Sequence, residues 1–427
     1  MKYTEMNPAQ LQKEKERLQA SYAEIRAKNL KLDMSRGKPE ASQAGLSAGL
    51  LQAVSSREDL FSEDGMDCAN YGILDGVPEA KRFVAEVMNC NPAQVSVWDN
   101  ASLMIMYTLI SLSYSKGVMG ELPWCQQKNL KFLCPVPGYD RHFAITEFFG
   151  LEMLSIPMDE NGPDMDQVEA YVKDPTVKGI WCVPLYSNPG GVCYSDETVR
   201  RMAALKPAAK DFRIYWDNAY CVHHLYPEQP VHLLNILEEC RKNGNENLVY
   251  EFFSTSKITI AGDGMAALIT SEENLKALRP QFSVMTVGFD KVNQLRHVRF
   301  LKNKENLQKH MEKHAAILRP KFEAVLRTLD SELGTLGVAR WSQPRGGYFI
   351  SLDTLPGCAR RVVELCREAG VVLTPAGSTY PYKRDPQDSN IRIAPTYPAP
   401  ADLMQACQVL TVCVRLASVE KLQKELQ

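Results

Sequence analysis

The stretch LVYEFFSTSK (residues 248–257) indicates the fold class of this chain more clearly than any other segment. Residues 248–253 are mostly aliphatic or aromatic, as in a buried strand, and a polar Ser-x-Ser-Lys turn follows at once. Lys257 would therefore lie at the carboxyl end of a strand, where open α/β sheets bind their ligands. A solvated surface lysine is the alternative for the same residue.

Short apolar runs alternate with helical patterns on both sides of this stretch. The predicted strands lie at residues 131–136, 151–156, 179–184, 213–217, 248–253 and 265–270. Helical patterns begin between them, near residues 101, 140, 164, 195 and 231. This alternation predicts an α/β fold in which a mostly parallel sheet lies between two layers of helices.

A smaller α+β domain is predicted downstream of this sheet. Long helical patterns at 291–301 and 304–329 lead into it, and its strands and helices are predicted at 347–352, 358–369, 371–375, 391–394 and 401–426. A helix over residues 7–29, capped by Asn7 with Pro8 in its first turn, is predicted to pack with this domain. We therefore divide the chain into an N-terminal helix and arm (1–60), a large ligand-binding domain (61–310) and a small C-terminal domain (311–427).

Composition excludes several classes of partner. The 427 residues include 49 basic and 51 acidic side chains, a balance that favours neither nucleic acid nor an anionic membrane. No run of eighteen apolar residues occurs, and the charged N-terminus lacks the apolar core of a secretory signal, so we expect a cytoplasmic protein. The 12 cysteines form no C-x-x-C pair, which favours small buried hydrophobic residues over disulfides or a metal site.

Polar side chains follow three of the predicted strands, and together they suit pyridoxal phosphate (PLP) and an amino acid. The amine of Lys257 could bond to the aldehyde of this cofactor as a Schiff base. Asp217 could pair with the nitrogen of the pyridine ring, which makes the ring an electron sink. Tyr220 and Asn188 could both donate to the phenolic oxygen of the ring. A helix cap or loop contact is the alternative for Asp217.

A phosphate site is predicted where Asn100, Ala101 and Ser102 open a helix. Backbone N–H groups at a helix N-terminus bind anions, and Ser102 adds a hydroxyl group. Ser254 and Ser256 could supply further hydroxyl groups to the same phosphate. Ordinary capping of the helix by Asn100 is the alternative.

Two more residues fit the same ligand. Tyr139, in the segment PGYDRH (residues 137–142), could stack on a flat heterocycle or could be a core aromatic residue. Arg392 lies in the short strand predicted at 391–394 and could bind an α-carboxylate through two hydrogen bonds, with a surface salt bridge as the alternative.

Together these residues resemble the PLP-dependent aminotransferases of class I/II, which have fold type I. The resemblance runs from about Ser35 to the C-terminus, and four segments place it closest to the bacterial aspartate aminotransferases called type Ic, a subgroup also described as MocR-like. These segments are LDMSRGKP (32–39), YGILDG (71–76), DNASL (99–103) and PGYDRH (137–142).

The resemblance implies an enzyme that moves an amino group from an L-amino acid, with aspartate favoured, to a 2-oxo acid, with 2-oxoglutarate favoured. It implies a homodimer with shared active sites, in which Tyr71 reaches the phosphate of the neighbouring subunit. Gly37 matches a glycine of the substrate loop, and Lys257 matches the lysine that also moves the substrate proton. Many members carry an arginine eight residues after that lysine as a phosphate clamp, but this chain has Met265 there.

A dicarboxylate substrate would need a second cation besides Arg392. Arg36, which adjoins Gly37, is the first candidate and Arg141 the second; a solvent-facing ion pair is the alternative for both. Two other functions remain open at this point. One is a different reaction on the same fold, such as a β-lyase or a decarboxylase, and the other is a non-catalytic, PLP-binding regulatory module.

Overall fold

The strand that precedes Lys257 is β8 (Val249–Ser254), and it lies within an eight-stranded sheet. The structure, a computed structural model, describes residues 1–426. The sheet has the order β2 (Val95–Val97), β9 (Ala266–Ile269), β8, β7 (Arg213–Asp217), β6 (Val177–Cys182), β3 (Lys131–Val136), β4 (Glu152–Asp159) and β5 (Gly162–Pro163). Strands β8 to β4 are parallel, whereas β9 and β5 run antiparallel to their neighbours. The predicted α/β architecture with a mostly parallel sheet is confirmed.

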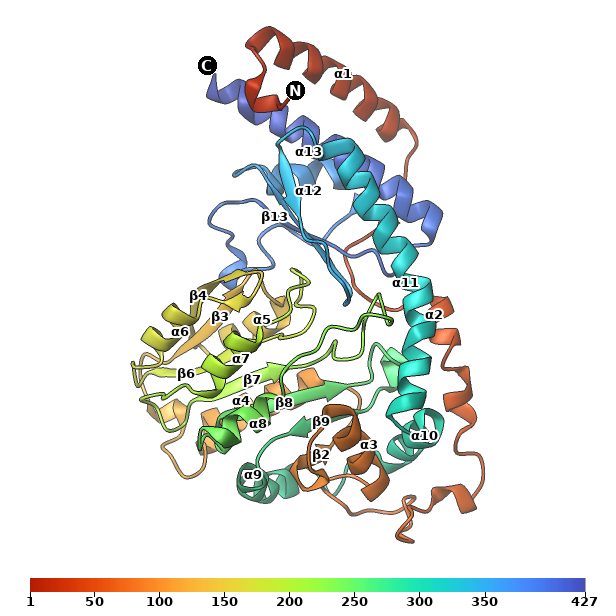
Figure 1. Cartoon of the computed structure of the whole chain (residues 1–427), viewed down its shortest axis with the longest axis vertical. Coiled ribbons are helices and arrows are strands. Elements are labelled where there is room, and N and C mark those ends of the chain that lie inside the picture. Colours follow the sequence, from red (N-terminus) through yellow and green to blue (C-terminus); the bar gives the residue numbers. More distant parts are fainter. Residues whose placement is uncertain (427) are drawn as a thin grey trace.

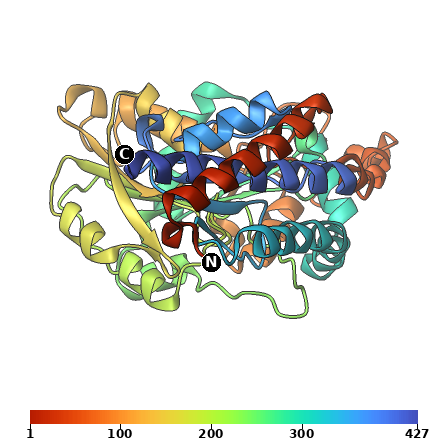
Figure 2. The ribbon, with the colours of Figure 1, turned by 90° about the horizontal axis from the view of Figure 1, so that it is seen from above.

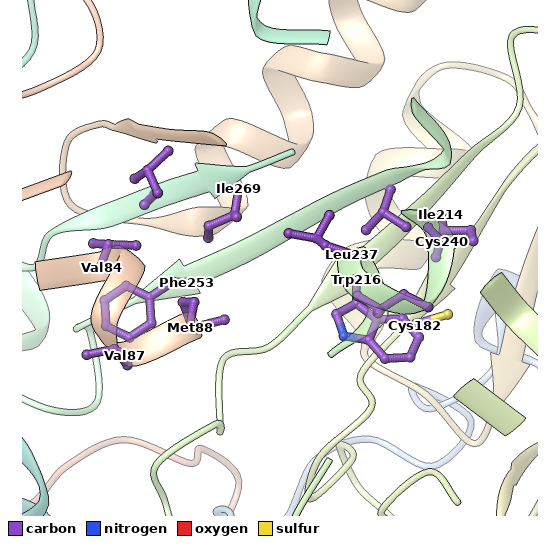
Figure 3. Packing of buried hydrophobic residues seen from close by; sticks show 14 of the residues in the cluster. Val84, Val87, Met88, Cys182, Ile214, Trp216, Leu237, Cys240, Phe253 and Ile269 are labelled. Carbon is purple, nitrogen blue, oxygen red and sulfur yellow. The ribbon is translucent and has the colours of Figure 1, made fainter. Parts of the chain in front are cut away.

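Helices cover both faces of this sheet, because its strands are apolar on both sides. One face packs against α3 (Pro78–Met88), α6 (Met165–Tyr171), α7 (Asp196–Ala203), α8 (Ile236–Lys242) and α10 (Lys291–Leu301). The other packs against α4 (Ser102–Lys116), α5 (Asp140–Phe148) and α9 (Glu272–Met285). Figure 3 shows the first face, where Trp216 lies beside α8 and Phe253 beside α3. The sheet is therefore buried on both sides, and ligands can reach it only at its edges.

The small domain is built on a three-stranded antiparallel sheet. Its strands are β10 (Ala339–Trp341), β11 (Ile350–Thr354) and β13 (Asn390–Ile393), and its helices are α11 (Lys304–Leu333), α12 (Ala359–Glu368) and α13 (Pro400–Glu425). The long helix α11 runs from this domain down to the large one (Figure 1). It therefore connects the two cores physically.

The N-terminal segment lies against the small domain at its start. Helix α1 (Pro8–Ala27) begins after Asn7, whose side chain accepts a hydrogen bond from the Gln10 amide at 2.9 Å. Figures 1 and 2 show α1 alongside α13, and the Tyr22 hydroxyl donates to the Leu365 carbonyl at 2.8 Å. Strand β1 (Leu32–Asp33) then pairs in parallel with β12 (Val371–Val372), and α2 (Ala41–Gly45) follows beside α11. The domain boundaries drawn from the sequence stay a prediction.

Some helices and strands begin at other residues than the sequence predicted, and two helices were not predicted. The helix predicted near residue 231 begins at Ile236, because Pro227 and Pro230 interrupt the helical pattern before it and Asn235 caps α8 by accepting from the Glu238 amide. The strand predicted at 347–352 begins at Ile350, since Gly347 has a φ of +79° and packs against Tyr186. Helices α3 and α9 were not predicted; α9 carries Pro280 in its interior.

Helix α13 has the length and composition of a membrane span. It is the one helix of residues 1–426 that meets both criteria, and 67% of its apolar window is buried inside the protein. It packs between α1, α11 and α12 in the small domain. Its apolar character is therefore explained by this packing.

Candidate active site

A cavity of about 800 Å³ lies at the carboxyl ends of the parallel strands, between the large sheet and the small domain. Most of the residues singled out in the sequence line it. They are Arg36, Gly37, Ser102, Tyr139, Arg141, Asn188, Asp217, Tyr220, Lys257 and Arg392. The fold thus brings together side chains from the N-terminal arm, five strand ends or helix starts, and β13.

Lys257 reaches this cavity from the turn after β8. Its ammonium nitrogen lies 5.1 Å from the ring centre of Tyr220 and 5.9 Å from that of Tyr348. Burial lowers the pKa of the Lys257 amine, and the nearby Asp217 carboxylate opposes this effect. A lowered pKa increases the fraction of free amine, which is the nucleophilic form.

The two carboxylate oxygens of Asp217 have different surroundings. Oδ2 accepts a hydrogen bond from His142 Nε2 at 3.0 Å, and the His142 ring stacks on Trp181 with centroids 4.4 Å apart. Oδ1 is buried and has no hydrogen-bond partner in residues 1–426. Buried polar atoms are nearly always paired, so Oδ1 has an open position for a donor from a ligand in the cavity. The ring N–H of PLP is such a donor, so the free oxygen of Asp217 and the polar side chains around it fit this cofactor.

Two tyrosines and one amide line the same region. Burial, together with Asp217, raises the pKa of Tyr139 to about 12. Burial and the neighbouring Tyr139 raise the pKa of Tyr220 well above its ordinary value, so both phenols keep their protons near neutral pH. Tyr139 directly precedes α5 and lies edge-on to His142. The amide oxygen of Asn188 is engaged by Arg392 Nη1 at 3.3 Å.

The two segments predicted to form the phosphate site lie side by side. The Ser256 hydroxyl donates to the Asn100 carbonyl at 3.0 Å, and the Ser254 and Ser256 hydroxyl groups are 2.7 Å apart. Helix α4 begins at Ser102, and its N-cap residue Ala101 supplies no side-chain cap. The first backbone N–H groups of α4 are therefore not capped by the preceding residue, a geometry suited to an anion.

Met265 does not take part in this arrangement through its side chain. It packs in the core of the large domain with no exposed surface, and its amide donates to Thr255 Oγ1 at 2.8 Å. A buried thioether carries no charge, so this position contributes no cation to the anion end of the cavity.

Arg392 lines the cavity from β13 of the small domain, and several contacts hold it there. Nη1 lies 3.2 Å from Asp140 Oδ1, Nη2 donates to Thr374 Oγ1 at 3.2 Å, and the guanidinium lies 4.7 Å from the ring centre of Phe349. The residue is 8% exposed, so a surface salt bridge does not describe it. Its Nε has no partner in residues 1–426.

The substrate-loop residues line the mouth of the cavity. Gly37 packs so tightly on Phe349 that an added Cβ would lie 2.3 Å from the ring, which explains the need for glycine here. Arg36 and Arg141 are exposed, and in the part of the chain described neither lies within ion-pair distance of a carboxylate. Tyr71 is 83% exposed and does not line the cavity of its own chain.

The comparisons with known proteins decide the family. The family model described as aspartate amino-transferase matches residues 6–426. This chain belongs to the aspartate aminotransferase family. The aspartate aminotransferase of Corynebacterium glutamicum is 46% identical over 406 residues, which cover 95% of this chain and 94% of that protein. The crystal structure of an aspartate transaminase from the same species has a TM-score of 0.96 at 44% identity and covers 99% of both chains.

A more distant aminotransferase shares the fold. LysN, an α-aminoadipate aminotransferase from Thermus thermophilus, has a TM-score of 0.73 at 20% identity, and the match covers 95% of this chain and 97% of that one. That structure was solved with N-(5'-phosphopyridoxyl)-L-leucine. The chain is therefore an aminotransferase of fold type I, as predicted, and the finer type Ic or MocR-like subgroup stays a prediction.

Several residues of this aminotransferase site were not anticipated. His142 and Asp140 lie in the quoted segment PGYDRH, but only their place beside Tyr139 at a helix start could have indicated a contact with the site. Trp181, Thr374 and Phe349 carried no signal, because a single aromatic or hydroxyl residue in a strand-like run is ordinary core sequence.

Proposed function

We propose that this aminotransferase uses PLP bound at Lys257 to transfer the amino group of L-aspartate to 2-oxoglutarate. One observation carries the proposal. The half-free carboxylate of Asp217, the amine of Lys257 with its lowered pKa and the buried Arg392 line one cavity. The names of the C. glutamicum relatives support aspartate as the donor.

Each side chain has a distinct task in this proposal. When bound, PLP supplies the electron sink that stabilises negative charge on the substrate Cα. Asp217 Oδ1 would accept from the ring nitrogen, while His142 holds Oδ2 in place. Tyr220 and Asn188 would donate to the ring oxygen, and Tyr139 would cover the ring face. Lys257 Nζ would hold the cofactor and then take the Cα proton from the substrate.

The phosphate would bind between the start of α4 and the turn after β8. Asn100, Ala101 and Ser102 would provide backbone N–H groups and one hydroxyl group, and Ser254 and Ser256 would provide two more hydroxyl groups. Since Met265 supplies no charge, binding would depend on these neutral donors and on a residue from a second subunit.

The substrate would bind through its two carboxylates. Arg392 would take the α-carboxylate, because its guanidinium already faces Asn188 and the cavity. Arg36 or Arg141 would take the side-chain carboxylate, since both line the cavity without an acidic partner in residues 1–426. Gly37 would let the loop that carries Arg36 lie against Phe349.

We further propose a homodimer in which Tyr71 completes the partner's site. Tyr71 is followed by Gly72, whose carbonyl accepts from Lys291 Nζ and lies against Gly288. Next to Gly288, Val287 is 65% exposed, so apolar surface gathers around Tyr71. A cytoplasmic location is supported by the twelve unpaired cysteines, most of them buried or half-buried.

The absorption spectrum tests the reaction. Adding aspartate to the enzyme loaded with PLP should shift the spectrum to that of pyridoxamine phosphate, and 2-oxoglutarate should reverse the shift. Release of pyruvate or ammonia would indicate lyase chemistry instead, and an unchanged spectrum would indicate a binding role. A screen of amino donors against 2-oxoglutarate would then rank aspartate among the alternatives.

A further inference from the structure

Three side chains contact the two carbonyl groups at and after Lys257, and a fourth lies directly behind them. The Lys257 carbonyl faces His223 Nε2 at 3.3 Å and the Tyr348 hydroxyl at 3.4 Å. The next carbonyl, of Ile258, faces His310 Nε2 at 2.8 Å, and His314 Nε2 lies 3.2 Å from that same His310 nitrogen. We call His223, Tyr348, His310 and His314 the carbonyl clamp. A carbonyl oxygen can only accept, so His223, Tyr348 and His310 must each present a hydrogen to it.

The donor pattern of the carbonyl clamp is fixed by Gln43 of α2. The Glu40 amide donates to Gln43 Oε1 at 3.2 Å, which orients the side-chain amide because a backbone N–H can only donate. Gln43 Nε2 therefore faces His314 Nδ1 and the Tyr348 hydroxyl, both at 3.1 Å, and donates to both. Nδ1 of His314 must then be the acceptor, so its hydrogen sits on Nε2.

The histidines of the carbonyl clamp are neutral. Burial lowers the pKa of His314 to about 4 and that of His223 to about 3, and it lowers the pKa of His310 as well. Each neutral imidazole has one N–H. The hydrogen of His310 points to the Ile258 carbonyl, and the hydrogen of His314 lies on the nitrogen that is 3.2 Å from His310 Nε2.

The participants come from parts of the chain that are far apart. Gln43 belongs to the arm that carries Arg36 and Gly37, and Tyr348 lies two residues before β11 of the small domain. His310 and His314 lie on the stretch of α11 beside the large domain, which Figure 1 shows next to α2. These groups meet at the backbone of Lys257 and Ile258, which His223, Tyr348 and His310 contact directly.

We propose that Gln43, His310 and His314 are positioning residues, and that Gln43 fixes the tautomer of His314 so that the carbonyl clamp holds the Lys257 backbone in place. This inference rests on the proposed role of Lys257. The side chain of Lys257 must meet both a ring aldehyde and a substrate Cα, and a shift of about 1 Å in such a group can cost roughly a hundredfold in rate. None of the three side chains lines the cavity, so they would act through the backbone.

Nitrogen spectroscopy tests the tautomer directly. Long-range ¹H–¹⁵N spectra of enzyme labelled with ¹⁵N-histidine should show His314 as the neutral Nε2–H form at pH 7. The signal of His314 is the one that disappears in the His314→Gln variant. An Nδ1–H form or a doubly protonated ring in the wild-type enzyme would overturn the proposal. The measurement needs no turnover.

Variants of Gln43 test the consequence. Gln43→Glu has nearly the same size but can only accept, so it should move the proton of His314 to Nδ1. Gln43→Leu removes the hydrogen bonds that Gln43 donates to His314 and Tyr348. It takes the place of Gln43→Glu as the test variant if Gln43→Glu does not fold. Ser418→Ala is the matched control, because it deletes a buried hydrogen bond to the Val414 carbonyl in α13, far from Lys257.

The Gln43 variants should show faster amide hydrogen exchange in the peptide spanning residues 252–262 and a kcat lowered by roughly tenfold or more, with little change in KM. Ser418→Ala should change neither. Equal exchange and equal kcat in Gln43→Leu and Ser418→Ala would refute the positioning role. Borohydride reduction followed by peptide mapping keeps the two proposals apart: a pyridoxyl label on Lys257 upholds its role whatever the Gln43 variants do, and a label elsewhere removes it.

Discussion

At the scale of single residues, the unequal environment of the Asp217 oxygens leads to a first prediction. Asp217→Asn keeps the shape of the side chain but replaces the carboxylate that would keep the ring nitrogen protonated. We expect kcat to fall by about a hundredfold or more with the fold retained, as when one preorganised electrostatic contact is lost. Steady-state kinetics together with circular dichroism would measure both.

A buried carboxylate elsewhere provides the control for this prediction. Asp211 pairs with Lys178 at 2.7 Å and with the Trp124 indole at 3.0 Å, away from the cavity. Asp211→Asn should lower the stability of the protein and spare kcat. A near wild-type kcat in Asp217→Asn would show that Asp217 does not serve the ring nitrogen.

The choice between Arg36 and Arg141 is also a matter of single residues. Arg36→Ala should lower kcat/KM for aspartate at least about 30-fold while sparing alanine, because losing one partner of a charge pair costs ~2–5 kcal/mol. Initial rates with both donors are the measurement. Equal losses for the two donors would exclude Arg36 as the reader of the side chain, and Arg141→Ala would then be tested in the same way.

At the scale of elements, β8 carries a buried acid whose cost depends on pH. Glu251 accepts from Asn218 Nδ2 at 3.0 Å, and burial raises its pKa from 4.5 to about 7. The folded protein therefore binds more protons than the unfolded chain between these values, so stability falls as the pH rises through this window. The loss of stability arises because burial disfavours the ionised form of the Glu251 carboxyl group.

Glu251→Gln should remove this dependence, since the amide oxygen can still accept from Asn218. Between pH 5 and pH 8 we expect the variant to gain on the order of 2–3 kcal/mol in unfolding free energy relative to wild type. Urea unfolding at both pH values is the measurement, with the exposed Glu160→Gln as control. A difference between variant and wild type that does not change with pH would contradict the raised pKa.

At the scale of the whole molecule, the exposed Tyr71 predicts that active sites are shared between subunits. Tyr71→Phe and Lys257→Ala should each be impaired as homodimers. Mixing them should restore activity, because each hybrid contains one site with neither lesion. Random re-pairing of equal amounts gives about a quarter of the wild-type activity. Refolding the two variants together and measuring the rate is the test, and a fully active monomer in sedimentation would refute it.

The sequence by itself determined that the large domain contains a mostly parallel sheet and that the candidate site lies at the ends of its strands. The strands at 131–136 and 213–217 were predicted to the residue, because apolar runs bounded by turn residues are local signals. Asn188, Asp217 and Lys257 follow strand ends, so topology alone brought them to one cavity. The start of α8 was misplaced, since two prolines and a capping asparagine there outweighed the apolar pattern.

Only the tertiary structure decided which polar atoms meet. His142 meets Asp217 and Gln43 meets His314 across 75 and 271 residues of chain, and no periodicity encodes such a pair. The side chain of Met265 faces the core, although the resemblance places a phosphate-clamping arginine at this position. Periodicity reports which side of an element is buried, whereas the partner of a buried donor or acceptor depends on which distant elements pack together.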